Sequence, residues 1–186
     1  MRRLLVTMVL FTTAAGVNTA SVAFQQRTAY LTRRFGPYGW CIHLVTVISL
    51  WVCFLALLPG LGRRVRWPLP SLVRPWGVPL LVVAALGWLI AFLQLGGTRT
   101  GNGNFFGHGS TEPVCGGIFA LLRNPMYDSY VLALVGAALH SGNAVYLLLA
   151  GQAAVLFHIE ADIENRPFAS HRRARSPAWR RMTTTW

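Results

Sequence analysis

The chain alternates between long uncharged runs and short segments that are rich in arginine, glycine and proline. Three of these runs, 4–24, 40–58 and 76–96, contain 19 to 21 residues each. At about 1.5 Å per residue, a helix of that length crosses the roughly 30 Å hydrocarbon core of a bilayer. We therefore expect three membrane-spanning helices in the first half of the chain.

The first run has a second interpretation. Arg2 and Arg3 precede it, and small residues such as Ser21 and Ala23 lie near its end, as in a cleaved signal peptide. Since further apolar runs follow and the run is long enough to span, we favour a retained first helix.

The second half of the chain begins with a glycine-rich segment, 97–112, and continues with two further apolar runs. Because glycine loses much conformational freedom in a helix, this segment predicts a flexible loop, or backbone that approaches a ligand closely at Gly101 and Gly103. The apolar runs, one ending at Leu139 and the other over 144–159, are separated by only four residues. This spacing predicts an antiparallel helical hairpin.

The predicted fold class is an all-α, polytopic membrane bundle with about five transmembrane helices. We expect residues 1–186 to form a single domain. Within it, 1–96 would contribute three spans, and 97–186 the glycine-rich loop, the hairpin and a basic tail.

The basic residues are 17 arginines, and the formal net charge is +12. Such a charge can indicate nucleic-acid binding, but these arginines lie between apolar runs rather than on one helical face. Arginines in that position are typical of loops that flank a bilayer. The three cysteines (Cys41, Cys53, Cys115) have no zinc-site spacing, so we expect neither a nucleic acid nor a metal ion as partner.

Counting the spans places the connector 25–39, the segment from 97 to Arg123, and the tail 165–186 on one side of the membrane. That side carries eleven arginines and the other side carries six. The positive-inside rule therefore predicts a cytoplasmic tail, in a bacterial inner membrane or the endoplasmic reticulum. The same count places Arg123 and Glu160 at one membrane face.

All five acidic residues lie beyond residue 111 (Glu112, Asp128, Glu160, Asp162, Glu164). Carboxylates at a bilayer boundary are costly unless they are paired or used, so this region is the candidate functional site. Glu160 and Glu164 are four residues apart and share a helical face, whereas Asp162 points elsewhere.

Asn124 and Pro125 predict the start of a helix. An asparagine side chain at the N-cap accepts hydrogen bonds from free backbone amides, and proline at the first helical position has no amide hydrogen to leave unpaired. Arg123 precedes this start and Tyr127 lies one turn inside. Because the hairpin turn is short, these residues can meet Glu160. The alternative to a functional site here is a structural Arg123–Glu160 ion pair.

The same region resembles a known motif. Residues 117–127 read Gly-Ile-Phe-Ala-Leu-Leu-Arg-Asn-Pro-Met-Tyr. They are similar to the G-x-Y-x-x-V-R-H-P-x-Y motif of the integral-membrane phospholipid and isoprenylcysteine methyltransferases. With Asn124 in place of histidine, the Asn-Pro-Met-Tyr form is most similar to the phosphatidylethanolamine N-methyltransferases. These enzymes also carry a glycine-rich segment, which residues 95–96 and 103–107 resemble.

The family has a Glu-Glu pair after the next helix. In this chain Glu160 matches one member of the pair, and Asp162 or Glu164 would substitute for the other. The resemblance implies S-adenosylmethionine as methyl donor, bound where the last two helices meet the cytoplasm. The candidate donor-binding residues are Gly101, Gly103, Arg123, Asn124, Pro125, Met126, Tyr127, Glu160 and Glu164.

The resemblance also implies roles for individual residues. Arg123 and the helix start at Pro125 would hold the donor's carboxylate, and Glu160 would hold its ammonium or ribose hydroxyls. For an amine acceptor, Glu160 or Asp128 would act as the base. Tyr127 would line the methyl path and face the cationic centre.

The leading interpretation is therefore a membrane enzyme that methylates a lipid, best matched by the amine of phosphatidylethanolamine. Alternative acceptors are an isoprenylcysteine carboxylate, which needs no base, and a small thiol. A non-catalytic membrane protein, in which the motif only stabilises the hairpin, is the alternative of another class. Binding of S-adenosylhomocysteine would separate it from the enzymes.

Overall fold

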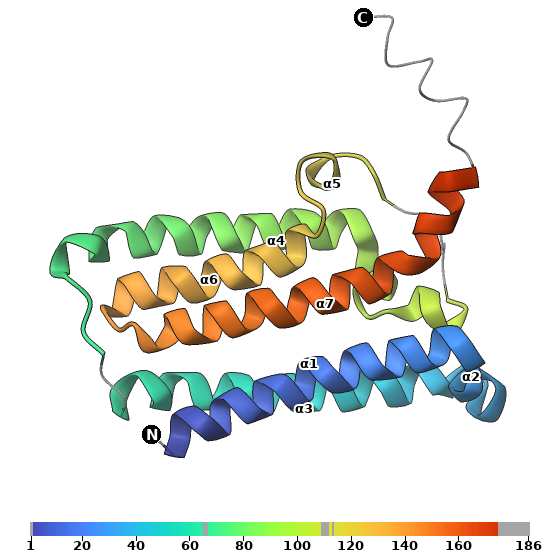
Figure 1. Ribbon diagram of the computed structural model, residues 1–186, viewed down its shortest axis with the longest axis horizontal. Coiled ribbons are helices and arrows are strands. Elements are labelled where there is room, and N and C mark those ends of the chain that lie inside the picture. Colours follow the sequence, from blue (N-terminus) through green and yellow to red (C-terminus); the bar gives the residue numbers. More distant parts are fainter. Residues whose placement is uncertain (1, 65–66, 109–111, 113, 175–186) are drawn as a thin grey trace, which may run out of the picture.

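The computed structural model describes residues 2–64, 67–108, 112 and 114–174 (Figure 1). This part of the chain is helical, and its one isolated β-bridge joins Pro68 to Asn143. The prediction of an all-α fold is confirmed. The α-helices and the two 3-10 helices, η1 and η2, are α1 (Arg2–Thr28), α2 (Tyr30–Phe35), α3 (Tyr38–Arg64), η1 (Ser71–Trp76), α4 (Gly77–Thr100), η2 (Gly103–Phe106), α5 (Ile118–Leu121), α6 (Pro125–Ser141) and α7 (Val145–Ala174).

Four segments of the described chain are long and apolar enough to cross a membrane: Arg2–Thr28, Tyr38–Leu61, Ser71–Phe106 and Val145–Glu164. The remaining predicted apolar helix, α6, has 17 residues. It packs against both α4 and α7 (Figure 1). The predicted polytopic bundle and its C-terminal hairpin are therefore both present.

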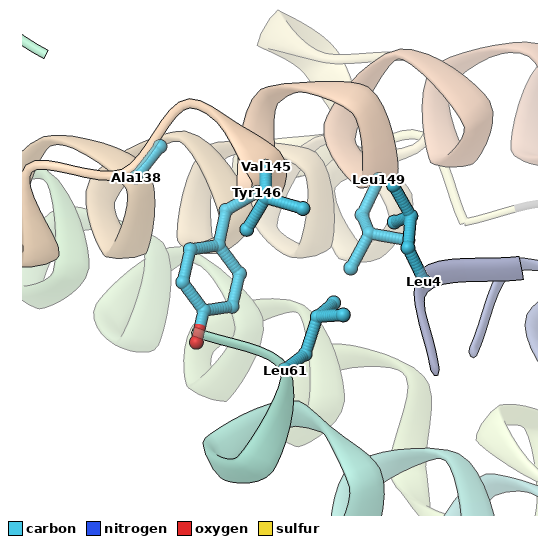
Figure 2. Packing of buried hydrophobic residues seen from close by; sticks show 6 residues of the cluster. All are labelled: Leu4, Leu61, Ala138, Val145, Tyr146 and Leu149. Carbon is cyan, nitrogen blue, oxygen red and sulfur yellow. The ribbon is translucent and has the colours of Figure 1, made fainter. Parts of the chain in front are cut away.

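Two buried apolar clusters hold the bundle together, with α1 packed against α3 and α7. One lies where the start of α1 meets the end of α3 and the hairpin turn, and Figure 2 shows its members (Leu4, Leu61, Ala138, Val145, Tyr146, Leu149). The other lies further along the same helices (Phe11, Phe54, Ala153, Phe157). The outer faces of α1, α3 and α4 expose large apolar side chains such as Leu5, Val45 and Leu93, as expected for surfaces that contact lipid.

The boundaries of three elements differ from the prediction. Helix α3 continues through Pro59 instead of ending at Leu58, because a proline removes only one helical hydrogen bond, which a membrane helix tolerates. The connector 25–39 contains the short helix α2. The glycine-rich segment is helical up to Thr100 and again in η2, and the backbone leaves helical geometry just before the segment, at Gly96, with φ 74° and ψ 159°.

Candidate functional site

Helix α6 begins at Pro125 with Asn124 at the N-cap, as the sequence predicts. The expected side-chain cap is wrong, because the Asn124 side chain makes no capping hydrogen bond. The Asn124 backbone carbonyl accepts from the Asp128 amide at 3.0 Å, and Asn124 lines a groove between α6 and α7. The start of α6 thus faces the groove and the middle of α7 (Figure 1).

Tyr127 connects α6 to the acidic face of α7. Its hydroxyl donates a hydrogen bond to Glu164 Oε2 at 2.9 Å and lies beside the Glu160 carboxylate. Its ring stacks on Phe157, with ring centroids 4.8 Å apart and an interplanar angle of 7°. Glu160 and Glu164 therefore share the face of α7 that meets Tyr127, as their spacing predicts.

Glu160 lies inside the bundle, with 1 % of its surface exposed. Its Oε1 accepts a hydrogen bond from Asn18 Nδ2 of α1, and Asn18 Oδ1 accepts from Asn102 Nδ2 at 3.0 Å. Sequence reasoning missed Asn18. The signal that could have found it is a strongly hydrogen-bonding side chain within an apolar membrane run.

The alternative interpretation, a structural Arg123–Glu160 ion pair, is wrong. Arg123 pairs with Asp162 instead, with 2.9 Å between guanidinium nitrogen and carboxylate oxygen. Residues two positions apart in a helix are separated by about 200° of rotation, so when Glu160 points into the bundle, Asp162 points outward to Arg123. His158 Nε2 lies 3.7 Å from the other oxygen of Asp162. These side chains are between 46 % and 73 % exposed, so this group lies at the edge of the site.

Gly101 and Gly103 lie where the end of α4 and η2 pack against α3. Trp40 Nε1 donates to the Gly101 carbonyl at 2.7 Å. A β-carbon at Gly101 would lie 3.1 Å from Leu44, and one at Gly103 would lie 2.7 Å from Thr98. Close packing accounts for both glycines, while their role in donor binding stays a prediction.

Met126 connects this glycine-rich segment to the start of α6. Its sulfur lies 4.0 Å from Thr100 Oγ1, at the end of α4. Pro125 is buried at the same junction. The structure thus brings the end of α4 next to the start of α6. Among the described residues, no hydrogen bond or ion pair joins Met126 or Pro125 to the two glutamates.

The groove between α6 and α7 has a volume of about 290 Å³. One end is lined by polar side chains, those of Asn124, Asp128 and His158, and the other by apolar ones such as Val131 and Val135. Tyr127 and Phe157 also line the groove, so the Tyr127 ring forms its wall while the hydroxyl binds Glu164. The groove therefore runs from a polar end to an apolar end, and Tyr127 is the side chain that joins its lining to the two glutamates.

Comparison with known proteins identifies the family. Residues 73–171, just over half of the chain, match the sequence model described as "Phospholipid methyltransferase". The chain belongs to the phospholipid methyltransferase family. A curated phosphatidyl-N-methylethanolamine N-methyltransferase from Emericella nidulans is 30 % identical over 148 residues, which cover 78 % of this chain and 73 % of that protein. No solved structure matches the chain.

Membership in the phospholipid methyltransferase family makes the chain an enzyme that methylates a membrane lipid, and its apolar helices make it an integral membrane protein. The reaction requires a methyl donor. The family match covers residues 73–171, so it includes α6 and all but the last turn of α7 and excludes α1 and α3. The site described above takes Tyr127, Glu160 and Glu164 from the matched region and Asn18 from outside it.

The two carboxylates of this phospholipid methyltransferase make an incompletely paired site. Asn18 and Tyr127, both uncharged, donate to them, and no described basic side chain forms an ion pair with Glu160 or Glu164. Glu164 Oε1 is buried without a hydrogen-bond partner among the described residues. A buried polar atom without a partner costs about 1–3 kcal/mol, so the site favours a ligand that brings hydrogen-bond donors or positive charge. The described residues contain no group of three or more His, Cys, Asp or Glu arranged to hold a metal ion.

Proposed function

We propose that this enzyme transfers a methyl group from S-adenosylmethionine to the amine of a phosphatidylethanolamine-type headgroup. The observation that carries the proposal is the cluster of Tyr127, Glu160 and Glu164, in which two carboxylates have only uncharged donors among the described residues. The cluster borders a groove that is polar at one end and apolar at the other. Such a site suits a cationic donor together with a lipid.

The residues present fit the donor. S-adenosylmethionine supplies an electrophilic methyl group on a positively charged sulfur, and it also carries an ammonium, a carboxylate and ribose hydroxyls. Glu160 and the free Oε1 of Glu164 would bind its positive and hydroxyl groups. Arg123, near the start of α6, would bind its carboxylate in competition with Asp162. Gly101 and Gly103, with Asn124, Pro125 and Met126, would form the remaining border.

The groove fits the acceptor. Apolar side chains such as Val131 and Val135 would hold an acyl chain, and Asp128 at the polar end would attract a headgroup ammonium. An ammonium has no lone pair, so a base must take its proton before the nitrogen can attack the methyl group. Asp128 or Glu160 would take that proton. The name of the Emericella nidulans relative, which refers to an N-methylated ethanolamine lipid, supports this acceptor.

Tyr127 would separate the two halves of the site. Its ring lines the acceptor groove and its hydroxyl binds Glu164, so the aromatic face would contact the cationic centre between donor and acceptor. Methyl transfer to an amine is an in-line displacement, in which positioning and exclusion of water account for much of the rate gain. The burial of Glu160 provides a site from which water is largely excluded.

The orientation in the membrane is part of the proposal. The end of α1, η2 and the second half of α7 lie toward one end of the bundle (Figure 1). The arginine count of the loops favours the cytoplasm for that end, and so for the tail, in a bacterial inner membrane or the endoplasmic reticulum. A donor made in the cytoplasm would then reach the site directly.

A reconstituted methylation assay tests the proposal. The full chain is placed in phosphatidylglycerol vesicles with or without phosphatidylethanolamine, and methyl-labelled S-adenosylmethionine is added. We expect labelled N-methylated lipid only where the amine lipid is present, with Glu160→Gln inactive and Tyr146→Phe active, because Tyr146 lies in the apolar cluster near the hairpin turn. A chain that binds S-adenosylhomocysteine but labels an isoprenylcysteine or a thiol instead would overturn the choice of acceptor.

A further inference from the structure

Helix α1 lies outside the region that matches the family, yet it reaches the most buried carboxylate of the site. Asn18, on α1, donates from Nδ2 to Glu160 Oε1, across 142 positions of sequence. Asn18 is 8 % exposed and Glu160 is 1 % exposed, so this hydrogen bond lies in the bundle interior. Hydrogen bonds to a charged group in such surroundings are stronger than those at the surface.

A residue that precedes the 3-10 helix η2 sets the orientation of the Asn18 amide. Asn102, at the start of η2, donates to Asn18 Oδ1 at 3.0 Å. Because the oxygen of the Asn18 amide is occupied by this donor, its NH₂ group is directed to Glu160. Asn102 itself has a φ of 61°, in the left-handed region that asparagine adopts more readily than most residues. The chain of contacts therefore runs from the segment after α4, through α1, to α7.

A second polar contact between α1 and α7 provides a contrast. Gln152 Nε2 donates to the Met8 carbonyl at 2.8 Å and to Thr12 Oγ1 at 2.6 Å. It joins the same two helices two turns away from Glu160 and touches no member of the site. Both contacts join α1 to α7, but only the Asn18 contact involves a carboxylate of the site.

We propose that Asn18 is a positioning residue for Glu160, so that α1 forms part of the donor site. This inference rests on the proposed function, in which Glu160 binds the donor. The Asn18 amide holds Glu160 Oε1 and so fixes the orientation of the carboxylate, and Asn102 keeps the amide in the donating orientation. Loss of the amide would leave Glu160 buried with a rotatable, partly unpaired carboxylate.

The test is a double-mutant cycle on S-adenosylhomocysteine binding, measured by isothermal titration calorimetry on the purified full chain. We expect Asn18→Ala to weaken binding roughly 10- to 100-fold, the range for losing a hydrogen bond to a charged group. In the Glu160→Gln background, Asn18→Ala should change affinity by no more than about twofold, because its effect acts through Glu160. The matched control, Gln152→Ala, should bind within about twofold of the wild type.

Asn18→Asp separates the loss of the amide from a loss of side-chain packing. It keeps the volume of the side chain but places a second carboxylate against Glu160, so we expect binding at least as weak as that of Asn18→Ala. The KM for the lipid should stay within about twofold in every variant of Asn18, which separates positioning of the donor site from general damage.

The outcomes are distinct. Wild-type affinity in Asn18→Ala and Asn18→Asp, or a loss that adds to that of Glu160→Gln, would overturn the inference while leaving the proposed function intact. A loss as large in Gln152→Ala would assign the effect to helix packing and overturn it as well. No binding by the wild-type chain would refute the proposed function and this inference with it.

Discussion

The hydroxyl of Tyr127 is the simplest part of the site to remove. Tyr127→Phe deletes one oxygen atom and retains the ring that stacks on Phe157 at 4.8 Å. The deleted oxygen donates to Glu164 Oε2 at 2.9 Å. Glu164 Oε1 already lacks a partner among the described residues, so the variant leaves neither oxygen of this carboxylate hydrogen-bonded to them.

The expected loss follows from the kind of hydrogen bond. Bonds to charged groups contribute about 1.5–3 kcal/mol, and Glu164 is only partly buried as a residue, so the lower part of this range applies. A loss of about 1.5–2 kcal/mol corresponds to a roughly 10- to 30-fold change in an equilibrium or rate constant. We expect it in the affinity for S-adenosylhomocysteine and in kcat/KM for the donor.

The assay compares Tyr127→Phe with Tyr146→Phe. The Tyr146 hydroxyl donates to the Leu58 carbonyl at 3.1 Å, so the control removes the same atom from a buried tyrosine in the apolar cluster of Figure 2. Titration calorimetry and labelled methyl transfer are measured for both variants. A Tyr127→Phe protein with donor affinity and kcat/KM within about twofold of wild type would refute the reasoning, as would an equal loss in Tyr146→Phe.

Other side chains give further predictions. Asp128→Asn should raise the KM for the amine lipid about tenfold and leave the affinity for S-adenosylhomocysteine unchanged. A variant with lower affinity for S-adenosylhomocysteine and an unchanged KM for the lipid would contradict the role of Asp128 in the acceptor groove. Arg123→Ala should weaken donor binding about tenfold, whereas Asp162→Ala should change unfolding stability by less than about 1 kcal/mol because their ion pair is exposed. Gly77→Leu should lower the free energy of unfolding by about 1–3 kcal/mol, because its side chain would overlap the end of α6. Gly16→Ala should not lower it, because Gly16 faces open space, and thermal unfolding of the two proteins distinguishes these effects.

The helices were predictable because length and composition decide them. Runs such as 40–58 and 76–96 hold no charge, and a bilayer accepts such runs only as helices. The start of α6 was also predictable, since proline is favoured at the first position of a helix. The end of α3 was not, because its surroundings tolerate Pro59 inside the helix, which local sequence rules treat as a break.

Within the site, the sequence could place Glu160 and Glu164 on one face of α7, but it could not identify their partners. Pairing depends on how each helix rotates about its axis, and a helix that is apolar on all sides carries little information about that rotation. The Asn18–Glu160 hydrogen bond and the exchange of Glu160 for Asp162 as the partner of Arg123 both follow from rotations set by packing. These contacts therefore became visible only with the assembled bundle.

We propose that this chain methylates an amine phospholipid through the cluster of Tyr127, Glu160 and Glu164. Mass spectrometry of total lipids tests it most directly, in cells that contain phosphatidylethanolamine and express the wild-type chain, Glu160→Gln or no protein. We predict that N-methylated phosphatidylethanolamine accumulates in cells with the wild-type chain. In cells with Glu160→Gln, its amount should equal that in cells without the protein. An unchanged phospholipid profile in cells whose expressed protein binds S-adenosylhomocysteine, or equal accumulation with Glu160→Gln, would contradict it.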